Sequence, residues 1–195
     1  MNIKPYIAEF IGTLILTLAI ILSMTAGFGV TTPLAAGLAM AFCVYTMKGI
    51  SGAHCNPAIT LGLLAVKKVS MQDAWLYVVA QLLGGLAAMQ VVNFFGVTPS
   101  AMAFADTTTT GVSEVLGTFI FAMGVAAVAH GKISQGATGL VVGLAFLLGI
   151  LLAAGSNGVL NPAVALGMGS MSLTYAFAPI VGAVIAMFVY RYMTE

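Results

Sequence analysis

Charged residues are scarce in this chain. Of its 195 residues, 6% are charged, whereas 61% are hydrophobic. A soluble domain must cover its surface with polar and charged side chains. This composition therefore excludes a soluble domain and indicates a protein of the lipid bilayer. The net charge is +1 and no basic patch occurs, so the sequence gives no indication of nucleic-acid binding.

Cysteine and histidine are scarce as well, with two residues of each. Cys43 and Cys55 are too few for a disulfide framework, and we interpret both as small apolar residues of a packed interior. No second histidine or cysteine stands at ligand spacing from His54, so no metal site and no cofactor are expected. His130 falls at the end of a different apolar segment, and without a nucleophile and a base in one place an enzyme is not expected.

Long apolar runs are abundant. A helix that spans the bilayer needs roughly 20 mostly apolar residues, and about six such segments are separated by Gly, Pro or short polar runs. They lack the period-two alternation of membrane β-strands, which excludes a β-barrel. The predicted fold is therefore an all-α membrane protein with spans at Tyr6–Met24, Thr32–Met47, Asp73–Phe95, Val112–Ala129, Gln135–Ala153 and Leu173–Tyr192.

The basic residues indicate the orientation of these spans. With the N-terminus on the cytoplasmic side, every lysine and arginine falls in a cytoplasmic segment, as the positive-inside rule requires. We therefore expect a multi-pass protein of the plasma or inner membrane with cytoplasmic N- and C-termini, and with Asp106 facing outward. The basic residues are Lys4, Lys48, Lys67, Lys68, Lys132 and Arg191.

The chain contains an internal repeat. Glu9 in AEFIGTLI and Glu114 in SEVLGTFI are 105 positions apart, and Asn56 and Asn161 are separated by the same number. We place the two repeats at approximately 1–98 and 99–195. Each holds three spans, and because three is odd the second copy starts from the opposite side of the membrane, which makes the repeats inverted.

Each repeat contains Asn-Pro-Ala within apolar surroundings. Asn is a good helix cap and Pro suits the first helical position, while the apolar run that follows, about ten residues, is too short to span. Irregular backbone at membrane depth is tolerated only inside the protein or beside a wet cavity. We therefore predict two re-entrant half-helices, near Pro57–Val66 and Pro162–Met168, whose positive N-termini meet in the interior. Two ordinary surface loops are the simpler alternative, but they do not account for the register with the paired glutamates.

The stretches SGAHCNPAITLG, 51–62, and GVLNPAVALG, 158–167, resemble the two signature loops of the aquaporin, or major intrinsic protein, family. The resemblance extends over essentially the whole chain and implies six tilted helices and two half-helices around an hourglass pore. It also implies a homotetramer with a separate pore in each subunit, and passive conduction of water or small uncharged solutes. By position, the pore motifs are Asn56, Pro57, Ala58, Asn161, Pro162 and Ala163.

Two asparagine amides at the midplane suit such a pore physically. An oxygen that crosses an apolar tube needs donors to replace its hydrogen bonds with water, and convergent helix N-termini raise the energy of a cation there. Glu9 and Glu114 have two possible roles, a proton relay or an acceptor for the backbone N–H groups of the re-entrant loops. The symmetry and the resemblance favour the second role. We interpret His54 as a loop-packing or pore-lining residue.

The expected outer constriction departs from the family pattern. Most members have Arg directly after the second Asn-Pro-Ala, where this chain has Val164, and a large aromatic residue twenty positions before the first motif, where it has Ala36. The positions twelve and three before the second motif hold Gly149 and Gly158. Because all four residues are small and apolar, we expect a wide, apolar outer opening that lacks the fixed positive charge of Arg.

The expected partners are membrane lipids and small neutral solutes. Besides water, these solutes include glycerol, urea, ammonia or hydrogen peroxide. Ala165 stands where glycerol facilitators typically have Asp, which weakens the case for a dedicated glycerol channel. Three alternatives stay open at this point: a poorly selective or ion-leaky pore of the same fold, a non-conducting scaffold, and a proton-coupled transporter.

Overall fold

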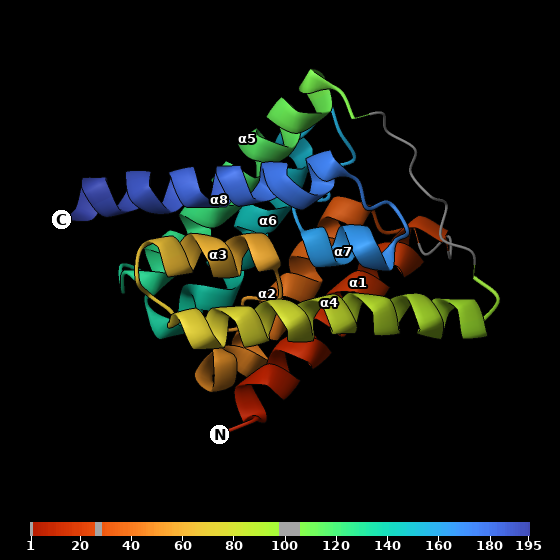
Figure 1. The fold of residues 1–195 in the computed structure, drawn as a ribbon, viewed down its shortest axis with the longest axis horizontal. Helices are drawn as coiled ribbons and strands as arrows, with labels where there is room; N and C mark the ends of the chain where they lie inside the picture. The colour runs from red at the N-terminus through yellow and green to blue at the C-terminus, as the bar shows by residue number, and fades with distance from the viewer. Residues whose placement is uncertain (1, 26–28, 98–105) are drawn as a thin grey trace.

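The computed structural model describes residues 2–25, 29–97 and 106–195, and within these ranges all regular structure is helical (Figure 1). Six helices are long and apolar enough to cross a membrane. They are α1 (Lys4–Thr25), α2 (Thr32–Ser51), α4 (Met71–Phe94), α5 (Thr108–Ala129), α6 (Thr138–Leu152), which follows the 3-10 turn η1 (Gln135–Ala137), and α8 (Leu173–Thr194). Two short helices, α3 (Pro57–Ala65) and α7 (Pro162–Gly167), complete the fold. The predicted fold class is confirmed, while the proposed boundary between the repeats, at 98 and 99, lies outside the described residues.

The helix ends differ from the predicted ones by a few residues, and capping explains the differences. α5 begins at Thr108 because the side chain of Thr107 accepts a hydrogen bond from the backbone N–H of Thr110, which caps the helix before its apolar run starts. α2 continues to Ser51, where Gly52 ends it in the left-handed conformation, with φ of 94°. Hydropathy identifies only the apolar part of a helix, so the predicted ranges leave out the polar first and last turns.

The two short helices lie end to end in the interior. In Figure 1, α3 and α7 follow one another along a line, with α8 passing on one side and α4 on the other. α3 packs mainly against α8, and α7 packs mainly against α4. Each half-helix is therefore held by a long helix of the other half of the chain, and both are enclosed by protein as irregular backbone at this depth requires.

Glycine permits the closest of these approaches. A Cβ on Gly85 of α4 would collide with the backbone carbonyl of Ala163, and one on Gly167 of α7 would lie 2.6 Å from the carbonyl oxygen of Gly85. The two backbones are thus in direct contact along the length of the second half-helix. Small residues allow this kind of packing between membrane helices, where no hydrophobic effect drives association.

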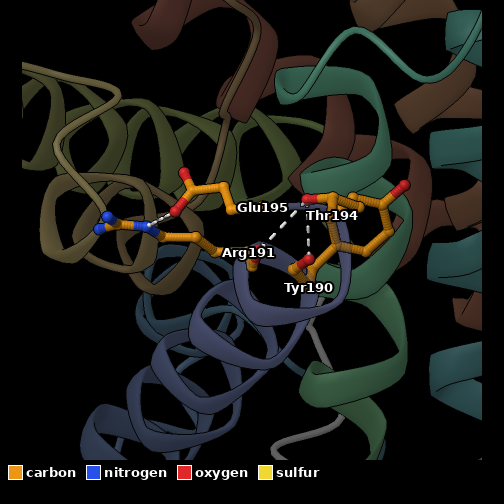
Figure 2. A network of polar contacts seen from close by, with 4 residues as sticks. All are labelled: Tyr190, Arg191, Thr194 and Glu195. Carbon is orange, nitrogen blue, oxygen red and sulfur yellow. Dashed lines mark hydrogen bonds and ion pairs between the residues drawn. The ribbon is translucent and has the colours of Figure 1, made fainter.

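Basic residues gather at one end of the bundle. Lys48 and Lys68 line the same cavity, and the carboxylate of Glu195 lies near Lys68, His130 and Arg191. At the end of α8, Arg191 Nε is 2.7 Å from Glu195 Oε2, and this hydrogen bond holds the pKa of that carboxyl below its usual value (Figure 2). The pair is exposed to solvent, so it marks this end of the bundle without stabilising it substantially.

An acidic side chain organises another loop. The Ser172 hydroxyl donates to Asp106 Oδ1 at 2.6 Å, and the backbone N–H of Thr174 donates to the same oxygen at 3.3 Å. These bonds lower the pKa of Asp106 and join the segment before α5 to the first turn of α8. A carboxylate at a helix N-terminus is also favoured by the helix dipole.

The contact between α4 and α7 gives a first prediction. We expect Gly85→Ala to destabilise the protein by roughly 1–3 kcal/mol, because the added methyl group must displace the backbone of α7. The midpoint of thermal unfolding in detergent measures this effect. Gly49→Ala is the matched control, since Gly49 is also helical but has open space around its Cβ position. Equal midpoints for both variants would contradict the close approach.

Candidate functional site

Both half-helices begin with the same cap. Asn56 precedes α3 in an extended conformation, and its side-chain oxygen accepts a hydrogen bond of 2.8 Å from the backbone N–H of Ala58. Asn161 does the same before α7, accepting 3.0 Å and 3.4 Å bonds from Ala163 and Val164. Pro57 and Pro162 occupy the first helical positions, where no N–H is needed. Each asparagine therefore has its oxygen directed into its own helix, and its amide nitrogen is free to donate elsewhere.

The amide nitrogens bond across the junction between the two half-helices. Asn56 Nδ2 donates to the backbone carbonyl of Leu160 at 2.8 Å, and Asn161 Nδ2 donates to that of Cys55 at 2.9 Å. The accepting residues are the neighbours of the opposite asparagine, so the two bonds are reciprocal. Cys55 and Leu160 have φ values of 50° and 55°. This left-handed conformation is costly for residues with a Cβ, and it is what turns their carbonyls toward the other loop.

Glu9 of α1 organises the first loop. Its Oε1 accepts from the Ser51 hydroxyl at 2.6 Å and from the backbone N–H of His54 at 2.9 Å, while its Oε2 accepts from the N–H of Cys55 at 2.6 Å. Gln81 of α4 adds a bond of 2.7 Å to Oε2. The carboxylate is fully buried, and these donors replace the water that it lacks.

Glu114 of α5 organises the second loop in the same way. Its Oε1 accepts from the Ser156 hydroxyl at 2.7 Å and from the N–H of Val159 at 3.0 Å, and its Oε2 accepts from the N–H of Leu160 at 2.7 Å. The serine and the two backbone donors match those of Glu9 one for one. The direct donors to both carboxylates are serine hydroxyls and backbone N–H groups, with the Gln81 amide added at Glu9, so the geometry suits an acceptor that holds a loop.

The first loop has a larger polar network than the second. His54 Nδ1 lies 3.1 Å from Thr60 Oγ1, Gln81 Nε2 donates to the same hydroxyl at 2.9 Å, and the Tyr77 hydroxyl donates to the carbonyl of Ser51 at 2.8 Å. Gln81 Oε1 has no partner in the described part of the chain. His54 is thus held by its ring and by its backbone, and its side chain also lines a cavity.

Each asparagine nitrogen has a second N–H. Across residues 2–25, 29–97 and 106–195, one acceptor is found for each Nδ2, although an amide carries two donors. Both side chains are fully buried. A buried donor without a partner is unfavourable by about 1–3 kcal/mol, so each amide keeps one donor that a further acceptor would satisfy.

A cavity of about 260 Å³ leads toward α3 from the basic end of the bundle; we call it the Lys48 cavity. Lys48 and Lys68 are its charged lining residues, and His54 lies in its wall. The remainder of the lining is apolar or glycine: Val44, Gly52, Ala53, Leu63, Val125, Val128, Ala129 and Val142. The space is large enough for several water molecules, and the two ammonium groups make it unfavourable for cations.

A second, much smaller cavity of about 20 Å³ lies near the start of α7; we call it the Gly158 cavity. This volume holds about one water molecule. Its side chains are mostly apolar, and it contains two of the four predicted constriction residues. The lining residues are Ile20, Met24, Thr32, Ile150, Asn157, Gly158, Val159, Val164 and Met168.

The expected width of this opening stays a prediction. Gly158 and Val164 line the cavity together with three larger residues, Ile20, Met24 and Ile150. These three residues gave no sequence signal beyond their apolar character. Their position follows from the rotation of α1 and α6 about their axes, which only the packed bundle determines.

Ala36 and Gly149, the other two predicted constriction residues, are not among the residues that line the Gly158 cavity. Ala36 is fully buried on α2. A Cβ on Gly149 would lie 2.5 Å from the carbonyl oxygen of Gly117, so this glycine serves the contact between α5 and α6. The next residue, Ile150, faces the cavity in its place.

The two cysteines are free and buried, as their interpretation as apolar residues requires. The Cys43 thiol donates to the carbonyl of Gly12 at 3.5 Å, and the Cys55 sulfur lies against the same glycine of α1. Neither residue lines the Lys48 cavity or the Gly158 cavity.

Comparison with known proteins agrees with this geometry. The family model for the major intrinsic protein matches residues 1–190. The chain belongs to the major intrinsic protein family. Among its relatives, the glycerol uptake facilitator protein-like 6 of Lactiplantibacillus plantarum is 33% identical over 214 aligned positions, which cover 97% of this chain and 98% of that protein. The aquaporin AqpM of Methanothermobacter thermautotrophicus is 30% identical, with 98% of each chain covered.

The fold of this major intrinsic protein is also found in a solved structure. The aquaglyceroporin from Plasmodium falciparum superposes with a TM-score of 0.80, covering 96% of this chain and 95% of the other at 24% sequence identity. This family consists of channels, not enzymes. The membership therefore agrees with the paired half-helices and with the two cavities that approach them.

The hydrogen bonds of Glu114 give a second prediction. Glu114→Gln keeps the shape of the side chain but replaces one acceptor oxygen with a donor, so at least one loop N–H loses its partner. We expect a loss of about 1–3 kcal/mol in unfolding free energy, measured as a lower thermal midpoint in detergent. Glu195→Gln, which affects an exposed carboxylate, is the control and should leave the midpoint unchanged. If Glu114→Gln instead alters the pH dependence of solute flux without altering stability, the carboxyl is a proton relay.

Proposed function

We propose that this protein is a passive channel for water and small uncharged solutes, in which Asn56 and Asn161 bind the oxygen of each passing molecule. One observation supports this most directly: each buried amide has a second N–H for which the described residues offer no acceptor. A water or alcohol oxygen that accepts from both would have its lost hydration replaced. The positive ends of the two half-helices make the same point unfavourable for a cation.

Glycerol is the solute that we propose besides water. Two relatives named above carry glycerol uptake or aquaglyceroporin in their names, and the apolar side chains of the Gly158 cavity suit the carbon backbone of a polyol. The absence of Arg at Val164 removes one barrier to such a solute, although the narrow cavity requires it to pass in single file. Urea and ammonia, which are smaller or flatter, are further solutes of the proposal.

We propose that the protein lies in the plasma or inner membrane with both termini in the cytoplasm. The clustering of Lys48, Lys68 and Arg191 at one end of the bundle supports this orientation, since basic residues are retained on the cytoplasmic side. The Lys48 cavity is then the cytoplasmic vestibule and the Gly158 cavity the external one. A homotetramer with one pore in each subunit is the assembly that the family resemblance implies.

A poorly selective, ion-leaky pore is the second candidate, because Val164 replaces the fixed charge of Arg. The two lysines of the Lys48 cavity count against cation leakage. Planar bilayers measure this directly: a current that rises with the amount of protein would support the leaky pore.

Reconstitution tests the proposed function. Stopped-flow light scattering of proteoliposomes should show water and glycerol permeabilities well above those of protein-free vesicles. Asn161→Asp keeps the cap acceptor and the shape of the side chain but removes both donors, including the one to the carbonyl of Cys55, so we expect water flux per channel to fall by at least roughly tenfold. Flux through the unaltered protein at the level of protein-free vesicles would refute the channel function.

Val164→Arg should restore a charged, narrower entrance. We expect glycerol flux to fall more than water flux, because the guanidinium group occupies part of the Gly158 cavity and offers donors that water can use. Val164→Leu adds bulk without charge and separates the two effects. A glycerol-to-water ratio that is unchanged in both variants would show that Val164 does not line the path.

A further inference from the structure

The Lys48 cavity and the Gly158 cavity do not share a lining residue. Neither lining contains Asn56 or Asn161, whose side chains are both fully buried. The two cavities are therefore separate, with buried side chains between them. The helices that line both cavities identify the residues that lie between them.

On α6, Phe146 lies between the residues that line the two cavities. Val142 lines the Lys48 cavity and Ile150 lines the Gly158 cavity. Residues four apart lie on one face of a helix, so Phe146 projects from the same face, midway along a distance of about 12 Å. Its side chain is fully buried. Along α6 it therefore separates the residue that lines one cavity from the residue that lines the other.

Residues on α2 and α5 can be placed between the two cavities by the same helical spacing. On α2, Thr32 lines the Gly158 cavity and Val44 the Lys48 cavity, with Met40 between them. On α5, Phe121 lies one turn before Val125, which lines the Lys48 cavity. The rings of Phe121 and Phe146 are in contact, with centroids 4.7 Å apart and planes inclined by 46°. Met40 and Phe121 are each 1% exposed, so water has almost no access to these side chains.

We propose that Phe146, supported by Phe121, is the main barrier of this pore and determines which solutes cross it. The proposal rests on the proposed channel function. An apolar constriction excludes ions because it cannot replace their hydration, and it admits a neutral molecule only when the side chain moves aside. In the family pattern, an Arg at the position of Val164 selects among solutes. In this chain we assign that selection to an aromatic side chain deeper in the protein, between the two cavities. Solutes that are large or strongly hydrated are slowed most.

A purely structural role makes a different prediction. If Phe146 only fills the core, shortening it leaves a cavity that lowers stability and does not change flux. If it is the barrier, shortening it opens the path, and the flux of glycerol rises more than that of water because the larger molecule gains more from the added width. The ratio of the two permeabilities therefore separates a barrier from a packing residue.

The experiment compares Phe146→Leu and Phe146→Ala with the unaltered protein in proteoliposomes, with permeabilities for water and glycerol normalised to the amount of folded protein. We expect permeability to rise in the order Phe, Leu, Ala, by about three- to tenfold for water in the alanine variant, with a larger gain for glycerol. Phe177→Ala is the matched control, because Phe177 lies on α8 and is 61% exposed. It should leave both permeabilities unchanged. If the alanine variant does not fold, the leucine variant and Phe121→Leu give the same test.

The outcomes separate the barrier from the channel. Permeabilities that do not rise in the Phe146 variants, in a protein that conducts and that Asn161→Asp slows, overturn the barrier and leave the channel function standing. Vesicles that do not conduct with any variant overturn the channel function itself. An unaltered protein that conducts weakly, together with an alanine variant that conducts well, supports both.

Discussion

Two reciprocal hydrogen bonds, from Asn56 to the carbonyl of Leu160 and from Asn161 to that of Cys55, are the interaction on which the rest of this structure depends. They join two loops that come from different halves of the chain, and they place two helix N-termini against each other. Each N-terminus corresponds to about half a positive charge, so the two repel unless something holds them together. The amides supply that attraction, and they also cap the helices whose ends they join.

The surrounding structure serves to keep those loops in place. Backbone groups at membrane depth have no water to bond with, and the buried carboxylates of Glu9 and Glu114 take over that function for the N–H groups just before each asparagine. The carboxylates are tolerated there because every donor that points at them is fixed by the fold. On the outside of this polar centre, close backbone contacts such as that between Gly85 and Gly167 allow α4 and α7 to approach without a side chain between them.

In the proposed path the paired asparagines are the polar point, and the two cavities on either side have mostly apolar linings. Its vestibules differ greatly in size, about 260 Å³ at the basic end and about 20 Å³ at the other. Positive charge is found in the larger vestibule, at Lys48 and Lys68, and not beside Val164 where the family pattern places it. Exclusion of cations can therefore arise from the lysines, the helix ends and the apolar centre acting in series, and no single fixed charge is needed.

The sequence by itself determined six apolar spans, the paired Asn-Pro-Ala motifs and the register between Glu9 and Glu114, because each is a matter of local composition or of spacing along the chain. It also predicted that Gly158 and Val164 lie at an opening. It did not determine how wide that opening is, nor that Ile150 faces it while Gly149 faces α5. A count of positions fixes neither the rotation of a helix about its axis nor the rotamers of its neighbours. The contact between Phe121 and Phe146 belongs to the same class: both are ordinary apolar residues in the sequence, and only the packing of α5 against α6 brings their rings together between the two cavities.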